Sequence, residues 1–247
     1  MLEYPFFGYE IDGIGKILKR REKAPDGTRK SNRSDETDRT RVSGAILAGG
    51  KSKRMGVEKA FIELGGSTII ERVIDTIGQI VSEIIIVTNA PEDFVHVKAR
   101  YIRDLPIGIV KDIHRGIGAL GGLHSGLYHA AEDQVFICAC DMPFINPELV
   151  RFIVKVLDKS DAAVPVVQGF FEPLLAAYSK RCIDSIERDI EKGERQILSF
   201  YDSVKLRKIN EWELRVFDRD LHSFININSP KDLIEAEKIL MTKRDER

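Results

Sequence analysis

The sequence predicts an α/β fold in which helices cover a mostly parallel β-sheet. Short apolar runs, several of them rich in β-branched residues, alternate along residues 44–166 with segments whose apolar side chains recur at helical spacing. Strands that alternate with helices in this way are typical of βαβ units. The chain has 247 residues, of which 43% are hydrophobic, so it is long enough for one large core. We expect one main domain over residues 44–242.

Strands are expected where apolar runs end at a polar residue or a turn. The first leads from Gly44 into Gly49-Gly50, and the second, Ile84–Val87, consists of β-branched residues. Three more are expected at residues 107–110, 134–139 and 161–166. Beyond them the pattern is less regular. Residues 173–178 look extended, and residues 204–227 are expected to form strand segments around a turn.

Helix starts are marked by capping residues. Thr68 and Glu71 have the spacing of a capping box, and the apolar residues that follow recur at helical spacing. Pro91 is expected to start a second helix, because the first turn needs no hydrogen bond from its nitrogen. Asn146-Pro147 and Ser229-Pro230 would begin two more. Further helices are expected over residues 120–131 and 182–192.

Residues 1–43 differ from the rest of the chain. After Lys19 the segment is dense in charge and nearly empty of apolar residues, so it cannot bury enough surface to offset the entropy of ordering. We expect a flexible extension. The aromatic-containing piece before it would be either a partner-binding arm or a simple appendage.

Composition excludes several classes of protein. The formal net charge is −1 and the pI is about 6.5, so no basic field indicates a nucleic-acid partner. The sequence contains no run of about 18 apolar residues, so no membrane span is expected. The N-terminal residues lack a signal-peptide pattern, so a cytoplasmic location is expected. The three cysteines are a poor disulfide framework and are expected to be small buried residues.

Polar clusters follow the predicted strands at their carboxyl ends, where ligands bind in open α/β sheets. The first is Leu47-Ala48-Gly49-Gly50, whose glycines let the backbone approach a ligand closely. Cationic side chains follow within ten residues at Lys51, Lys53, Arg54 and Lys59. Lysine and arginine side chains both bind phosphate groups, although the Walker sequence pattern is absent. A solvated basic loop is the alternative interpretation.

Two further clusters come from the middle of the chain. Asn89 follows the second strand and could contact a base or ribose, or simply form a turn. Asp112 follows the third strand, and the glycine-rich residues 116–122 then open a helix whose N-terminus would attract an anion. His114 and His124 border this loop. We expect packing or surface roles for them, because neither has an evident orienting partner.

The last two clusters contain a carboxylate and a pair of carboxamides. Asp141 ends a hydrophobic strand, where a carboxylate needs a partner. Mg²⁺ takes one or two carboxylates plus phosphates, so Asp141 is the predicted metal ligand, with a turn cap as the alternative. Asn226 and Asn228 would share one face of a strand and could hold a phosphate acceptor or a metal-bound water. An ordinary strand exit into a helix cap is the competing interpretation of Asn228.

In their order, these motifs resemble those of the molybdenum cofactor guanylyltransferases. The resemblance covers residues 44–240. It rests on the motif from Leu47 to Lys59, on Cys140-Asp141-Met142-Pro143 and on the segment from Asn226 to Pro230. It also includes Gly118-Ala-Leu-Gly-Gly122, Glu172-Pro173-Leu174 and Gly193-Glu-Arg195. Two residues depart from the family pattern: Glu58, where the family often has Asp before the lysine, and Glu172, where some members have His or Gln.

The resemblance implies a Rossmann-like domain of the nucleotide-diphospho-sugar transferase type. It implies GMP transfer from GTP to the terminal phosphate of molybdopterin, with Mg²⁺ and release of pyrophosphate. Leu47, Ala48, Gly49, Gly50, Asn89 and Asp112 would bind the nucleotide. Arg54, Lys59 and Asp141 would be catalytic, Asp141 also binding Mg²⁺, and Asn226 and Asn228 would face the pterin. Cofactor-synthesis or molybdoenzyme-delivery proteins are possible partners.

The sequence is also compatible with other functions. A cytidylyltransferase for a molybdopterin cofactor, or a sugar-phosphate nucleotidyltransferase, would share this fold, because fold does not fix substrate. A non-catalytic adaptor protein that binds a nucleotide is the alternative from outside the enzymes. The presence of both Lys59 and Asp141 argues against the adaptor.

Overall fold

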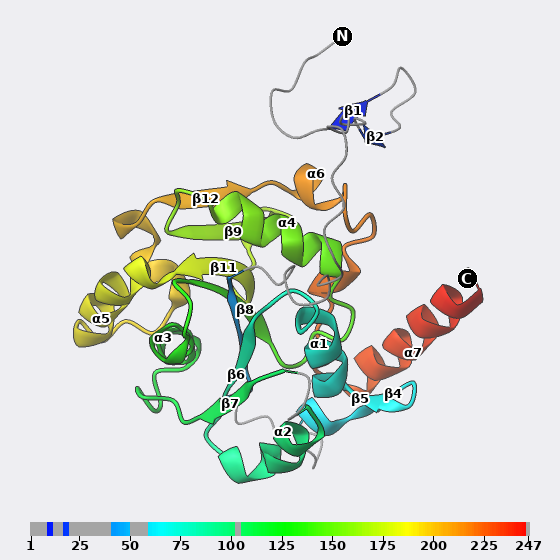
Figure 1. Cartoon of the computed structure of the whole chain (residues 1–247), viewed down its shortest axis with the longest axis horizontal. Coiled ribbons are helices and arrows are strands. Elements are labelled where there is room, and N and C mark those ends of the chain that lie inside the picture. The colour runs from blue at the N-terminus through cyan, green and yellow to red at the C-terminus, as the bar shows by residue number, and fades with distance from the viewer. Residues whose placement is uncertain (1–8, 12–16, 20–40, 50–58, 102–104, 246–247) are drawn as a thin grey trace, which may run out of the picture. The chain divides into compact units, whose positions relative to one another are not determined.

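The computed structural model describes residues 9–11, 17–19, 41–49, 59–101 and 105–245 (Figure 1). The chain divides into two compact units, Met1–Thr37 and Asp38–Arg247. In the first unit, β1 (Tyr9–Ile11) pairs antiparallel with β2 (Ile17–Lys19), a pairing that the sequence did not predict. The charged residues 20–40 lie outside the described residues, so their expected flexibility and the boundary at residue 43 stay predictions.

The second unit is built on an eight-stranded sheet, counted over the described residues. Its strand order is β10-β9-β11-β8-β3-β6-β7, with β12 beside β9. The strands are β3 (Ser43–Leu47), β6 (Glu83–Val87), β7 (Ile107–Val110), β8 (Gln134–Ala139), β9 (Ala162–Val167), β10 (Phe170–Phe171), β11 (Leu175–Ser179) and β12 (Leu206–Ile209). The pairs β3–β6, β3–β8, β6–β7 and β9–β12 are parallel, whereas β11 is antiparallel to its neighbours. The predicted α/β fold with a mostly parallel sheet is therefore confirmed.

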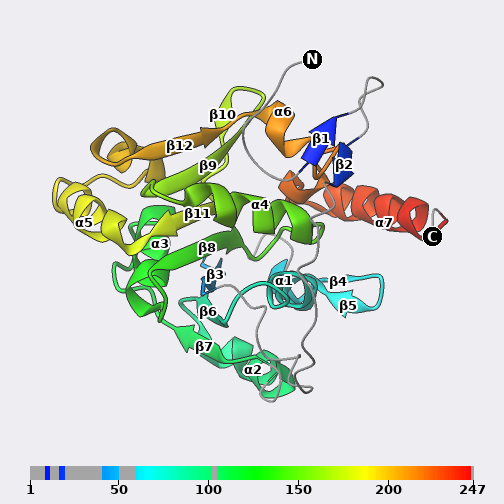
Figure 2. The ribbon, with the colours of Figure 1, turned by 45° about the horizontal axis from the view of Figure 1, so that its top comes forward.

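Helices cover both faces of this sheet (Figure 2). The alternation of side chains along β3 sends Ile46 into one apolar layer and Ala45 into the other. The layer that contains Ile46 is completed by α1 (Ile69–Ile77), α2 (Val95–Tyr101) and α4 (Pro147–Leu157). The layer that contains Ala45 is completed by α3 (Ala119–His129) and α5 (Ile183–Glu191). The central strands β3, β6 and β8 are thus buried on both faces, which explains their continuous apolar sequences.

The predicted helix starts are also confirmed. Thr68 and Glu71 form a capping box at the start of α1. Asn146 caps α4 and accepts from the backbone of Glu148. Pro91 begins a 3₁₀ turn, Pro91–Phe94, which continues into α2. The short antiparallel pair β4 (Glu63–Leu64) and β5 (Ser67–Thr68) was not predicted, since two-residue strands carry little pattern.

The expectation of strand segments around a turn within residues 204–227 is confirmed only in part. Only β12 is a strand, and α6 (Glu211–Leu214) follows it, starting at a capping box formed by Asn210 and Glu213. Next the Asp218 carboxylate accepts backbone N–H bonds from His222 and Ser223, which closes a turn in place of a strand. The last helix is α7 (Pro230–Asp245).

The cysteines behave largely as expected. Cys138 and Cys182 are buried, Cys140 is partly buried, and none of the three forms a disulfide. Burial raises the pKa of the Cys182 thiol to about 12. No helix among the described residues is long and apolar enough to cross a membrane.

Asp161 joins three neighbouring segments at the start of β9. Its Oδ1 accepts from Arg181 Nε at 2.6 Å, and its Oδ2 accepts the Lys205 backbone N–H at 2.8 Å. Partial burial acts to raise the pKa of Asp161, but the Lys205 and Arg181 donors outweigh it and bring the pKa below the ordinary 3.8. The charged form is therefore favoured by folding.

This pairing predicts a pH-dependent loss of stability. The Asp161 carboxylate stabilises the fold above pH 3.8, and the contribution disappears as pH falls through the lower folded-state pKa. Asp161→Asn should reduce the free energy of unfolding at neutral pH by about 1 kcal/mol. Urea denaturation should show this deficit shrinking as the pH approaches about 3. The exposed Asp202→Asn serves as control, and a deficit of equal size at both pH values would contradict the prediction.

Candidate active site

The carboxyl ends of the central strands are tied together by backbone hydrogen bonds. The Ala48 N–H donates to Val87 O at 2.8 Å, and the Cys140 N–H donates to Leu47 O at 3.2 Å. The loop after β3 is thereby fixed to the ends of both neighbouring strands. Leu47, Ala48 and Gly49 lie at this edge, as the sequence predicts. Gly50 and Arg54 lie outside the described residues.

Asn89 reaches the same edge from the turn after β6. A Cβ placed on Gly49 would lie 3.8 Å from Asn89 Nδ2, so this exposed amide lies beside the glycine. The turn is held by the buried Thr88, whose Oγ1 accepts the Ala90 N–H at 3.2 Å. Asn89 and Gly49 are brought together, in agreement with a shared nucleotide pocket.

A lysine, a carboxylate and an amide meet at the end of β8. Lys59 Nζ lies 3.7 Å from Asp141 Oδ2 and donates to Asn228 Oδ1 at 2.6 Å. The side chains of Lys59 and Asp141 are only 12% and 17% exposed. These three residues come from the 3₁₀ turn Lys59–Phe61, from the turn after β8 and from the approach to α7. We call them the Lys59 group.

The approach to α7 is anchored from both sides. The Ile227 N–H donates to the Asp141 carbonyl oxygen at 3.0 Å. The Asp232 carboxylate accepts the backbone N–H groups of Asn228 and Ser229, each at 2.8 Å. Ser229 Oγ in turn accepts the Asp232 N–H, so the predicted cap of the last helix also fixes Asn228.

Burial sets the electrostatics of the Lys59 group. Burial raises the pKa of Asp141 above its ordinary 3.8, and the charge of Lys59 opposes part of that rise. A carboxylate in this position favours additional positive charge. Hard oxygen ligation of this kind fits Mg²⁺, which commonly takes one carboxylate with the phosphates of a substrate. Among the described residues there is no cluster of three metal-ligating side chains, so Asp141 would be the protein's contribution here.

The two asparagines have different hydrogen-bond partners in the structure. Asn228 contacts Lys59, whereas Asn226 Nδ2 lies 3.4 Å from the Phe224 carbonyl oxygen. The strand expected here is not formed, since residues 225–228 belong to no strand. A turn closed by the Asp218 carboxylate precedes them.

Asp112 is fixed within the loop after β7. The carboxylate is buried, and its Oδ1 accepts the His114 N–H at 2.9 Å and lies 3.1 Å from Ser125 Oγ. Gly121 allows α3 to approach, since a Cβ there would lie 2.8 Å from the His114 carbonyl oxygen and 3.1 Å from Asp112 Oδ1. Within the described residues Oδ2 receives no hydrogen bond, which leaves it for a ligand.

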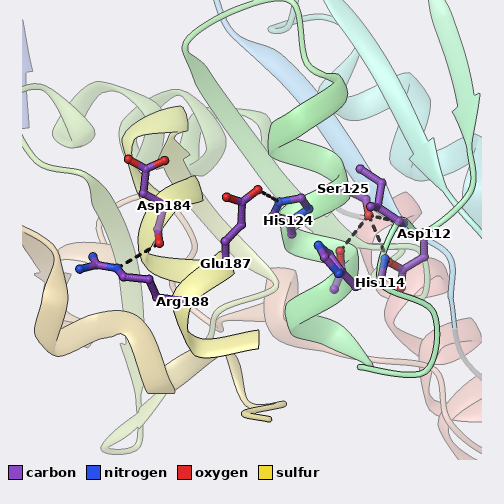
Figure 3. A network of polar contacts seen from close by, with 9 residues as sticks. Asp112, His114, His124, Ser125, Asp184, Glu187 and Arg188 are labelled. Carbon is purple, nitrogen blue, oxygen red and sulfur yellow. Dashed lines mark hydrogen bonds and ion pairs between the residues drawn. The ribbon is translucent and has the colours of Figure 1, made fainter. Parts of the chain in front are cut away.

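One contact of this region was missed from the sequence, and Glu172, which the resemblance singles out, lies in it as well. His124 does have an orienting partner, because its Nε2 lies 2.9 Å from Glu187 Oε1 on α5 (Figure 3). Glu172 lies near the end of β8, since the Leu174 carbonyl oxygen accepts the Ala139 N–H. Burial raises the pKa of the Glu172 carboxyl group. No local motif marks the His124–Glu187 contact, because 63 positions separate the two residues.

Comparison with known proteins agrees with this arrangement. The family described as the MobA-like NTP transferase domain matches residues 44–206. A molybdenum cofactor guanylyltransferase from Desulfosudis oleivorans is 38% identical over 82% of this chain and 98% of its own.

Solved structures give the same result. Molybdopterin-guanine dinucleotide biosynthesis protein A from Archaeoglobus fulgidus superposes with a TM-score of 0.69 at 32% identity, covering 81% of this chain and 99% of that one. 4-Diphosphocytidyl-2C-methyl-D-erythritol synthase from Anaerococcus prevotii has a TM-score of 0.63 at 17% identity, over 81% of this chain and 96% of that one, which shows the shared fold alone. This chain therefore belongs to the molybdenum cofactor guanylyltransferase family of nucleotidyltransferases.

Proposed function

We propose that this chain transfers GMP from GTP to the terminal phosphate of molybdopterin, with release of pyrophosphate. The observation that carries the proposal is the Lys59 group at the carboxyl edge of the sheet, in a chain of this family. It places a cation and a partly buried carboxylate within 3.7 Å of each other, beside a glycine-containing loop.

The reaction needs little from acid–base chemistry. An oxygen of the acceptor's terminal phosphate attacks the α-phosphorus of GTP in line, the bond to the β-phosphate oxygen breaks, and pyrophosphate leaves. A phosphate monoester is already anionic near neutral pH, so no general base is required. The protein's work is to position the two substrates and to offset negative charge.

Lys59 is suited to that work because its ammonium group is already oriented. The Asn228 carboxamide oxygen and the Asp141 carboxylate hold Nζ from two directions, so little side-chain freedom remains to be lost when a phosphate oxygen binds. Asp141 would hold Mg²⁺, which supplies charge neutralisation at the triphosphate when bound. Arg54, also assigned to the phosphates, lies outside the described residues.

The nucleotide would be received by the loops that follow β3, β6 and β7, which are consecutive neighbours of β8 in the sheet. Leu47, Ala48, Gly49 and Asn89 would contact it from the loops after β3 and β6, and the Asp112 carboxylate from the loop after β7. In our proposal the pterin approaches from the side of Asn226 and Glu172. Delivery partners and the cytoplasmic location stay predictions.

Removing the oriented cation should abolish most of the rate. Lys59→Ala is expected to lower turnover on the order of 100-fold or more, as when one preorganised donor is removed. Initial rates of pyrophosphate release with GTP, Mg²⁺ and molybdopterin measure this. The exposed Lys98→Ala is the matched control and should keep normal turnover. Near-normal activity of Lys59→Ala would exclude Lys59 from the mechanism.

The role of the Asp141 carboxylate is tested separately, by the dependence of the rate on Mg²⁺ concentration. Asp141→Asn should raise the Mg²⁺ concentration needed for half-maximal rate by about tenfold or more, since a neutral amide replaces a charged ligand. Asp133→Asn is the matched control, because this exposed aspartate precedes the same strand that Asp141 follows. An unchanged Mg²⁺ titration for Asp141→Asn would place the metal elsewhere.

Base choice decides between this function and its close rivals. The wild-type chain should bind GTP at least tenfold more tightly than CTP or UTP, measured by titration calorimetry with Mg²⁺ present. Preference for CTP would indicate a cytidylyltransferase, and preference for UTP with a sugar phosphate would indicate a sugar nucleotidyltransferase. Tight binding with no pyrophosphate release would support an adaptor.

A further inference from the structure

A polar contact joins α3 to α5 away from the Lys59 group. His124 Nε2 lies 2.9 Å from Glu187 Oε1. The imidazole is 2% exposed, whereas the Glu187 side chain is 47% exposed. A carboxylate only accepts hydrogen bonds, so Nε2 carries the proton and donates it. Figure 3 shows the imidazole lying between Glu187 on α5 and the loop that carries Asp112 and His114.

Burial of the His124 side chain is unfavourable for the stability of the fold. The apolar layer to which α3 and α5 contribute contains Leu123, Leu127 and Ile186, and the His124 ring lies against the rings of His114 and Tyr128. Its Nδ1 is buried and has no hydrogen-bond partner among the described residues. An unpaired buried nitrogen weakens a fold, and an apolar side chain would avoid the loss. The histidine therefore needs an explanation other than packing.

The His124 ring contacts the loop that fixes Asp112. The ring centroids of His114 and His124 are 4.5 Å apart, and the planes are nearly perpendicular. His114 donates its backbone N–H to Asp112 Oδ1, the same oxygen that Ser125 Oγ approaches. Ser125 also accepts the Ile113 N–H at 2.9 Å. Two consecutive residues of α3 thus fix this loop, Ser125 through hydrogen bonds and His124 through its ring.

We propose that Glu187 and His124 are a positioning pair for the nucleotide-binding loop. Glu187 fixes the rotation of the imidazole, the imidazole fixes the His114 ring, and the turn from Asp112 to His114 is held in the geometry that receives the nucleotide. The pair acts through Asp112 and touches no substrate itself. This inference rests on the proposed function, because it takes Asp112 to contact GTP.

The test compares substitutions that remove or keep the contact. Glu187→Ala should raise both the Kd and the KM for GTP by about tenfold, the lower end of the loss when an orienting partner is removed. The KM for molybdopterin should stay within about twofold, because the acceptor does not use this loop. Glu187→Gln keeps an oxygen that accepts from Nε2, so it should recover most of the GTP affinity.

Controls separate positioning from general destabilisation. Asp184→Ala changes another exposed carboxylate on the same helix and should leave every constant unchanged. Glu187→Ala should lower the melting temperature by no more than about 4 °C, so the chain is folded under assay conditions. His124→Phe keeps a ring against His114, and its loss of GTP affinity should not add to that of Glu187→Ala.

The outcomes distinguish this inference from the proposed function. If the wild-type chain fails to bind GTP, the proposed function is wrong, and the same variants are then compared with the triphosphate that it does bind. Equal nucleotide affinity of the wild-type chain and Glu187→Ala would overturn the positioning pair. Equal losses for nucleotide and acceptor, or no recovery in Glu187→Gln, would overturn it as well.

Discussion

The site depends on one ion pair, between Lys59 and Asp141 at the end of β8. A carboxylate at the end of a buried strand is unfavourable unless positive charge lies nearby, and burial raises the Asp141 pKa for that reason. Lys59 offsets part of that cost, and Asn228 holds the lysine in place. Three segments far apart in the chain must meet for this to happen. The parallel sheet and the cap of α7 bring them together.

The buried Asp112 carboxylate is also held in place by neighbouring groups, but these are neutral hydrogen-bond donors. In the described part of the chain Asp112 forms no ion pair, and it is held instead by the His114 N–H and by Ser125. Gly121 lets α3 come close enough for these contacts. The helix therefore supplies the loop with the hydrogen bonds of Ser125 and with the contact between the rings of His124 and His114. An ion pair therefore stabilises the site at the end of β8, and contacts from α3 stabilise the loop after β7.

Much of this was predictable from sequence because it follows from periodicity and strand direction. Apolar runs and capping residues located the strands and helices, and parallel strands must end at the same edge, which placed Asp141 near the loop after β3. The approach to α7 was not predictable, because its alternating pattern indicates a strand where the chain forms the Asp218 turn and an irregular segment whose Asn228 contacts Lys59. Contacts between helices leave no local pattern, so the partner of His124 could not be found.

The most direct test of this account is a crystal structure of the chain with GTP and Mg²⁺. The account predicts a metal ion on the Asp141 carboxylate and Lys59 Nζ within hydrogen-bond distance of the same triphosphate. A nucleotide bound with its phosphates away from Asp141, or with Lys59 contacting no phosphate oxygen, would contradict it.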